Sequence, residues 1–166
     1  MKHTKFKVSF NYSASNSFNE NGQDQLEFLI MTNIGEDFKP LVKIASGGEM
    51  SRIMLAIKSV LAEVDEVETL VFDEIDTGIS GIAANKVAEK MKQISKTHQI
   101  ICVTHLATIA AKGDSNYYIN KEIVEGKTKT NISLLKDKKL VEEIARIASG
   151  EITAVSLQYA TELIRK

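Results

Sequence analysis

The alternation of apolar and polar positions predicts two strands near the start of the chain and a helix after them. Apolar and polar residues alternate from Phe6 to Phe10, and a second apolar run extends from Leu26 to Met31. The stretch between these runs is rich in Ser, Asn and Gly, so we expect two strands joined by a flexible loop. Further along, apolar residues recur at helical spacing and predict one buried helix face. These residues are Met50, Ile53, Met54, Ile57, Val60, Leu61 and Val64.

A strand, a helix and a second strand are predicted next. Leu70 to Phe72 form a short continuous apolar run, which is typical of a parallel strand covered on both faces. The stretch "QIICVTH" predicts another buried strand. Five apolar residues between the two strands have helical spacing, so the unit predicts parallel strands with a right-handed crossover. These five are Ala84, Val87, Ala88, Met91 and Ile94.

The last third of the chain predicts a hairpin and two helices. The segments "SNYYINKEI" and "KTNISLLK" have the composition of strands, with a turn near residues 125–127. Helices are expected over Leu140 to Ala148 and Ala154 to Ile164, separated by Gly150, a residue type that commonly ends helices. The predicted fold class is therefore α/β, with parallel strands flanked by helices and a β-hairpin near each end.

Composition narrows the class of protein. Among 166 residues, 22 acidic and 21 basic side chains nearly cancel, which disfavours a strongly basic nucleic-acid-binding surface. A small basic cluster, Lys136, Lys138 and Lys139, is typical of a solvated loop before a helix. The single cysteine, Cys102, lies in an apolar run and is expected in the core. No apolar run approaches the roughly 20 residues that a membrane span needs, so we expect no membrane association and a cytoplasmic location.

Three chemically active side chains follow the two predicted parallel strands. Asp73 and Glu74 come after the first, and His105 after the second, at the strand ends where such sheets gather active groups. Adjacent strand residues point opposite ways, so one acid is expected to face a magnesium ion and the other to deprotonate a water. A neutral imidazole at residue 105 can donate to a phosphate oxygen. The alternatives are a strand-capping turn for the acids and a structural hydrogen bond for the histidine.

The stretch "SGGE", Ser46 to Glu49, opens the predicted helix. Two glycines let the backbone approach a ligand closely, and the free amides of a helix start attract anions. Ser46 adds a hydroxyl donor and also suits a helix N-cap. The alternative is a simple capped turn, with the Glu49 carboxylate near the positive end of the helix dipole.

Taken together, the three motifs resemble those of ABC-type ATPase heads, and Glu49 in place of the glutamine common in transporters points to the SMC-like branch. The segments "IASGGEMSRIMLAIKSVLA", "LVFDEIDTGISG" and "VTHLATIAAKGD" resemble the bacterial RecN family of DNA repair proteins most strongly. The likeness extends from about Leu26 to Lys166, and the first 25 residues are much less diagnostic.

The resemblance implies a role for each motif residue. Ser46, Gly47, Gly48 and Glu49 would form the signature loop, which binds ATP held by a partner head. Asp73 would be the Walker B magnesium residue, acting through water, and Glu74 the catalytic base. Asp76 would be the D-loop acid and His105 the switch histidine. Ala45 departs from the leucine of many signature loops, which weakens only the transporter interpretation.

No G-x-x-x-x-G-K-[ST] phosphate loop occurs in the chain. In the family that loop belongs to an N-terminal half-head, separated from the C-terminal half by a long coiled coil. The resemblance therefore implies that residues 26–166 are the C-terminal lobe of an ATPase head and that residues 1–25 lead in from the coiled coil. We expect the isolated chain to be inactive, and ATP and Mg²⁺ to bind only when the N-terminal half is present.

The family's function implies the partners. ATP binding would join two complete heads as a homodimer, and the full-length protein would contact DNA during double-strand-break repair and recombination. Two alternatives remain: a non-catalytic module for dimerisation or DNA interaction, and the lobe of another SMC or ABC ATPase. Intact Asp73, Glu74 and His105 argue against the non-catalytic module, because such a module does not need all three.

Overall fold

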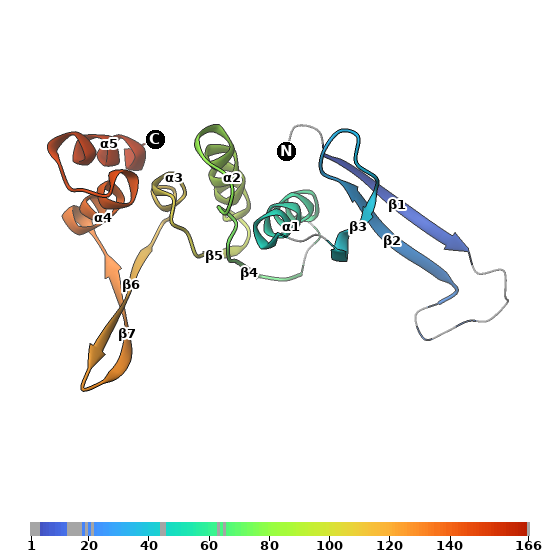
Figure 1. The fold of residues 1–166 in the computed structure, drawn as a ribbon, viewed down its shortest axis with the longest axis horizontal. Helices are drawn as coiled ribbons and strands as arrows, with labels where there is room; N and C mark the ends of the chain where they lie inside the picture. Colours follow the sequence, from blue (N-terminus) through green and yellow to red (C-terminus); the bar gives the residue numbers. More distant parts are fainter. Residues whose placement is uncertain are drawn as a thin grey trace. The chain divides into compact units, whose positions relative to one another are not determined.

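The fold consists of two compact units, residues 1–46 and residues 47–166 (Figure 1). A computed structural model describes residues 4–12, 18, 20, 22–43, 46–62, 64 and 66–165. Most of the polar loop expected between the first two strands, and Ala45, lie outside these residues. Each unit is described by itself below.

The first unit is a three-stranded antiparallel sheet. Strands β1 (Lys5–Tyr12) and β2 (Asp24–Met31) pair along their whole length, and the two-residue β3 (Lys39–Pro40) pairs with β2. A short 3-10 helix, η1 (Leu41–Lys43), follows. Both predicted strands are thus confirmed. The expected boundary at residue 25 falls at the start of β2, so the two strands of one hairpin lie on either side of it, and the role of residues 1–25 stays a prediction.

One face of this hairpin carries apolar side chains that remain exposed. Phe6 lies opposite Ile30, and the Phe6 and Phe28 ring centroids are 5.4 Å apart. Alternate positions of paired strands share a face, so these side chains form one continuous stripe. Its exposed members are Phe6, Val8, Phe10, Leu26 and Phe28.

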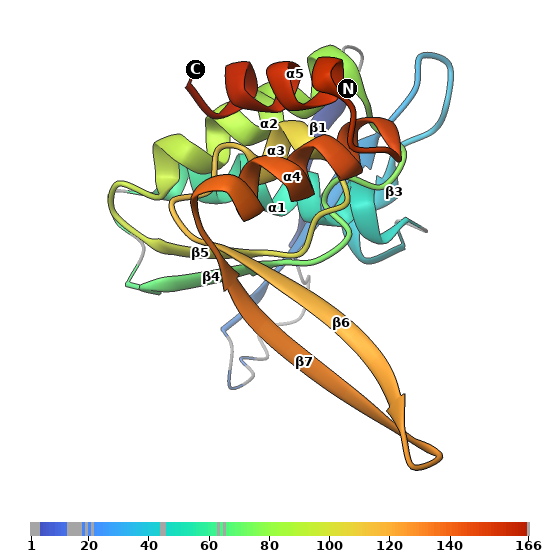
Figure 2. The ribbon, with the colours of Figure 1, turned by 90° about the vertical axis from the view of Figure 1, so that its left-hand side faces the viewer.

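The second unit begins with a parallel pair of strands and two helices. Helix α1 (Gly47–Leu61) precedes β4 (Thr69–Phe72), and helix α2 (Gly81–Ile94) connects β4 to β5 (Gln99–Cys102). The two strands pair in parallel, as predicted. All five apolar residues predicted to form the inner face of α2 are buried. All of them except Ala84 pack with Leu55, Phe72 and the fully buried Ile75 in one core. Figure 2 shows α1 and α2 on the same side of the β4–β5 pair.

The prediction for the buried face of α1 was largely wrong. Of its seven residues only Ile53 is buried, and the side chain of Val60 is 82% exposed. Leu55, which was not among them, is buried instead, and Val64 lies beyond the helix end. Helix α1 therefore packs on its neighbours in this chain through a different and narrower stripe. The apolar side chains of the predicted face lie partly on the surface.

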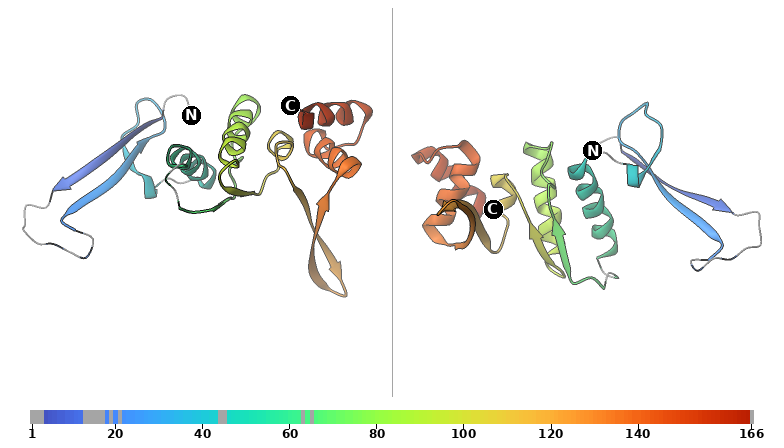
Figure 3. Two further views of the ribbon diagram at one scale, coloured as in Figure 1. Left: turned by 180° about the vertical axis from the view of Figure 1, so that it is seen from behind. Right: turned by 60° about the horizontal axis from the view of Figure 1, so that its bottom comes forward.

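A hairpin and two helices complete the unit. After the short helix α3 (Ala107–Ala110), which the sequence did not predict, strands β6 (Asn116–Val124) and β7 (Lys127–Leu135) form a twisted antiparallel ribbon (Figure 3). Helices α4 (Asp137–Ser149) and α5 (Ala154–Arg165) follow, and Gly150 ends α4 at φ 81°. The predicted hairpin and both helices are confirmed. None of the described helices is long and apolar enough to cross a membrane.

Candidate functional site

The turn after β4, residues 73–77, holds both acids predicted to carry chemistry. Strand β4 ends at Phe72, so Asp73 and Glu74 follow the strand, and strand alternation does not set their directions. Glu74 instead has φ 57°, in the left-handed region. Its amide donates to Asp73 Oδ1 at 2.9 Å, and its carbonyl accepts the Thr77 amide at 3.0 Å. The two acids thus differ in placement because the turn is left-handed at Glu74, which corrects the reason predicted from the sequence.

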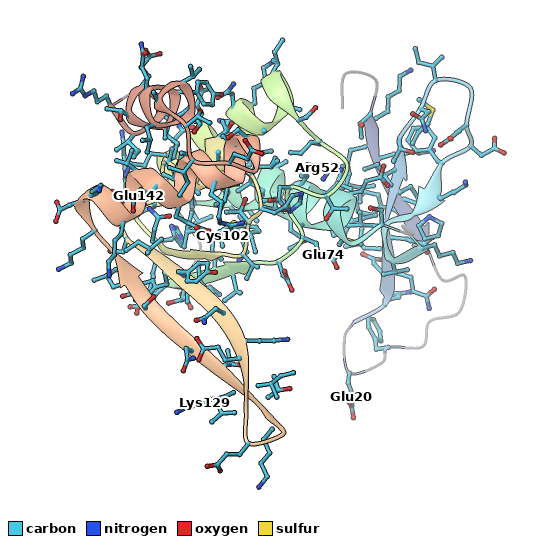
Figure 4. The ribbon with its side chains drawn as sticks, turned by 60° about the vertical axis from the view of Figure 1, so that its left-hand side comes forward. Glu20, Arg52, Glu74, Cys102, Lys129 and Glu142 are labelled. Atoms are coloured by element: carbon cyan, nitrogen blue, oxygen red, sulfur yellow. The ribbon has the colours of Figure 1, made fainter. Side chains whose placement is uncertain are left out.

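Helix α1 binds this turn through two side chains that the motif analysis missed. Ser51 Oγ donates to the Asp73 carbonyl at 2.8 Å. Arg52 Nη1 donates to the carbonyls of Ile75 and Thr77, at 3.1 and 2.8 Å. Three alternate carbonyls of the turn therefore accept hydrogen bonds from one turn of helix. Figure 4 labels Arg52 on α1 and Glu74 in the turn.

The two glycines at the start of α1 lie against the same turn. A Cβ atom added to Gly47 would meet Glu74 Oε2 at 2.5 Å. One added to Gly48 would meet the carbonyl oxygens of Glu74 and Thr77, each at 2.9 Å. Gly48 is buried, so the absence of a side chain is what lets helix and turn approach this closely. Helical spacing places Gly48, Ser51 and Arg52 on one face, and this spacing could have identified the missed pair.

Asp76 is a buried acceptor that joins the turn to the end of β5. Its side chain is 2% exposed, and Oδ2 accepts hydrogen bonds from Thr104 Oγ1 at 2.6 Å and from the His105 amide at 2.7 Å. Thr104 Oγ1 in turn accepts the Leu106 amide at 3.1 Å. Charge-assisted bonds of this kind are strong and directional. Asp76 thereby fixes the backbone that carries His105, and Thr104 is a third residue, after Ser51 and Arg52, that the motif analysis missed.

The His105 ring is largely exposed and touches Asp76 on one side only. Its Nδ1 lies 3.1 Å from Asp76 Oδ2, while 70% of the side chain is accessible. An ionised carboxylate only accepts, so the proton in this contact belongs to Nδ1. A neutral ring would then present Nε2 as an acceptor. In that tautomer Nε2 does not donate to a phosphate oxygen, and the role of His105 toward phosphate stays a prediction.

The charge of Arg52 is affected both by its burial and by the nearby carboxylate of Glu49. Burial lowers the pKa of Arg52, and the Glu49 carboxylate partly opposes this shift. Arg52 Nε is buried without a hydrogen-bond partner in the described part of the chain. Glu49 thus acts on the charge of Arg52 from within the predicted signature loop. Ser46 directly precedes α1, which begins at Gly47.

Cys102 packs against the core, as predicted, but is only partly buried. Burial, then the charges of Asp76 and Asp73, raise its pKa from 9.0 to about 12. The folded protein therefore holds the thiol proton more tightly than the unfolded chain does. The stability that this contributes is complete below about pH 9 and is lost as the pH rises toward 12.

We expect iodoacetamide at pH 8 to alkylate Cys102 in the folded chain at least about tenfold more slowly than in the urea-unfolded chain. Equal rates would contradict this placement.

Asp73 fits a magnesium ion that is held mainly by a nucleotide. Its carboxylate is exposed at the end of β4, with Oδ1 accepting the Glu74 amide. Within the described residues no group of three or more His, Cys, Asp or Glu side chains could hold a metal ion. Magnesium commonly takes one or two protein carboxylates and completes its shell with phosphate oxygens and water. A single exposed carboxylate such as that of Asp73 suits a magnesium ion shared with a nucleotide, and does not suit a site whose ligands all come from the protein.

The chain is similar in sequence to several bacterial DNA repair proteins named RecN. The chain is 46% identical over 167 residues to the DNA repair protein RecN of Halalkalibacterium halodurans, 45% over 148 residues to that of Bacillus subtilis and 49% over 145 residues to that of Treponema pallidum. These matches cover 99%, 89% and 87% of the chain but only 30%, 26% and 25% of the relatives. The match to the Halalkalibacterium halodurans protein includes nearly all of residues 1–25, a part of the chain in which the motifs are not diagnostic. No family model matches the chain.

Solved structures support the fold. The Smc head domain of Pyrococcus yayanosii, with a coiled coil and joint, matches 85% of the chain and 25% of that protein at a TM-score of 0.57 and 21% identity. The Smc head domain of Pyrococcus furiosus, with an extended coiled coil, matches 98% of the chain and 34% of that protein at a TM-score of 0.51 and 21% identity. The resemblance predicted from the motifs is confirmed: over nearly its whole length the chain is similar to a segment of RecN DNA repair proteins, and its fold resembles that of Smc head domains.

Proposed function

We propose that this chain supplies the hydrolytic half of a composite ATP site in an SMC-like ATPase that acts in DNA double-strand-break repair. One observation carries the proposal. The turn of residues 73–77 is held between the glycine start of α1 and the residues before His105, by hydrogen bonds from Ser51, Arg52 and Thr104. This arrangement brings together every motif from Gly47 onward that the resemblance implies.

Each residue then has a chemical task. The carboxylate of Glu74 accepts a proton from the attacking water. Asp73 would hold a magnesium ion through water, and that ion would supply positive charge to offset the phosphates. Asp76 fixes the backbone of His105, so that the exposed ring faces outward from a rigid support. Rigid support matters because the protein's part in phosphoryl transfer is mainly positioning and electrostatics.

The other half of the site is expected from the N-terminal part of the same head. The sequence contains no phosphate loop, and an open groove of about 220 Å³ runs between α1 and β4. It is lined by Met50, Ser51, Met54, Lys58, Leu70, Val71 and Phe72. Apolar side chains gathered on a surface of this kind support contact with a partner. A second complete head would then bring its nucleotide to the signature loop, Ser46 to Glu49, whose helix start attracts phosphate.

The proposal predicts no ATP turnover by this chain alone. Mixed with a polypeptide that carries the phosphate-loop half of the head, it should gain Mg²⁺-dependent ATPase activity, measured as phosphate release. The phosphate-loop half alone is the control and should also be inactive. Robust turnover by the isolated chain would overturn the proposal. A folded, ATP-binding pair without turnover would instead favour the non-catalytic module for dimerisation or DNA interaction.

A further inference from the structure

We propose that Arg52 is a positioning residue for Glu74, holding the turn of residues 73–77 in its left-handed form from helix α1. The inference rests on the proposed function, because it assigns Arg52 to the placement of the proposed base. It adds a residue outside the predicted motifs.

The turn needs external support because its backbone is strained. Glu74 adopts φ 57°, a left-handed conformation that is sterically unfavourable for a residue other than glycine. Such strain persists where the surrounding contacts over-determine the backbone. The hydrogen bonds of the Glu74 backbone are local: its amide donates to Asp73 Oδ1, and its carbonyl accepts the Thr77 amide. These bonds join neighbours in the chain and do not fix the turn to the rest of the fold.

Arg52 supplies that fixation from a different element. Its Nη1 bonds the carbonyls of Ile75 and Thr77, which lie 23 and 25 positions away in the sequence. The two carbonyls follow Glu74 along the turn, while Ser51 holds the Asp73 carbonyl that precedes it. The base is thus bracketed on both sides by bonds from α1. A planar guanidinium suits this task, because its donors have fixed directions.

Filling space does not by itself account for an arginine at residue 52. The guanidinium is half-buried, no carboxylate forms an ion pair with it among the described contacts, and Nε lacks a hydrogen-bond partner there. Replacing a buried charged group by an apolar one of similar volume is often neutral or stabilising. Packing alone therefore does not explain an arginine here. Its bonds to the turn do, since a methionine would fill the space and leave both carbonyls unheld.

The test uses the chain paired with the phosphate-loop half. Arg52→Met should lower kcat for ATP by about 10- to 100-fold, because displacement of a catalytic group by about 1 Å costs up to that much. KM for ATP and ATP-driven head dimerisation should stay within about twofold, since Arg52 lies outside the proposed phosphate contacts. Arg52→Lys should recover part of kcat. The matched control, Arg146→Met, removes an exposed arginine that pairs with Glu143 on α4 and should change neither constant.

A second measurement does not depend on activity. Amide hydrogen exchange at Thr77 and Ile79, which donate to the carbonyls of Glu74 and Asp76 in the turn, should be faster in Arg52→Met, with exchange in α4 and α5 unchanged. Faster exchange with a kcat loss supports the inference. Unchanged exchange, or a kcat equal to that of the wild type, overturns it. An inactive wild-type pair would count against the proposed function, and the exchange comparison would then decide by itself whether Arg52 holds the turn.

Discussion

Replacing Glu74 with glutamine should reduce ATP turnover of the reconstituted head by roughly 10²–10⁴-fold, the range that a general base contributes. Glutamine preserves the size of the side chain but cannot accept a proton from water. ATP binding does not need that proton transfer, so closed head dimers should accumulate. Phosphate release measures the first effect, and size-exclusion chromatography in the presence of ATP and Mg²⁺ measures the second.

The chain offers a matched control for this substitution. Glu125 is also a glutamate with positive φ, 52°, but it lies in the turn between β6 and β7. Glu125→Gln therefore makes the same chemical change on a similar backbone, away from the proposed site, and should leave turnover unchanged. If Glu74→Gln turned over ATP at the wild-type rate, Glu74 would not be the base.

Gly48→Ala should destabilise the fold by roughly 1–3 kcal/mol relative to Gly47→Ala, the cost usual for overpacking. The alanine Cβ at residue 48 would lie 2.9 Å from two backbone carbonyls and also from Arg52 Nη1, so α1 and the turn must separate. At residue 47 it would meet only the end of the Glu74 side chain, which can rotate away. Both substitutions gain the same helix preference of about 1 kcal/mol, so their difference isolates the contact. Urea unfolding of the two variants measures it.

The outcome also separates two roles for the glycine pair. Equal stability of both variants would mean that Gly48 does not control the approach of helix and turn. Gly47→Ala should retain the fold while moving the Glu74 carboxylate, so its turnover should fall with little change in stability. If Gly47→Ala lost turnover and stability together, the two glycines would act as one packing contact.

The elements that the sequence predicted correctly are those whose pattern is completed within this chain. All five apolar positions of α2 are buried because both neighbouring layers come from the same unit. The β6–β7 turn was predictable because Gly126, between two strand-like runs, allows the positive φ that a two-residue hairpin loop requires. For α1 the same periodicity failed, since side chains such as Val60 face away from the layers present here.

The motif residues could be placed near the right strand ends, but their contacts could not. The left-handed backbone of Glu74 was not foreseeable, because glutamate is not a residue type that favours that conformation. Asp76 was expected as a loop acid, whereas the structure buries it as an acceptor for Thr104 and the His105 amide. Burial of this kind depends on a partner 28 and 29 positions away, which local patterns do not contain.

The separation in sequence between these contacts has a consequence for the order of folding. The β6–β7 hairpin closes over a turn of two residues, and hairpins form in about 1–10 μs. The bonds from α1 to the turn after β4 span 22 to 25 positions, and the β4–β5 register spans 30. Ordering a longer stretch of chain loses more conformational entropy before its contacts form and offset that loss. The hairpin should therefore form early, and the arrangement of Glu74, Asp76 and His105 only once the helices have docked.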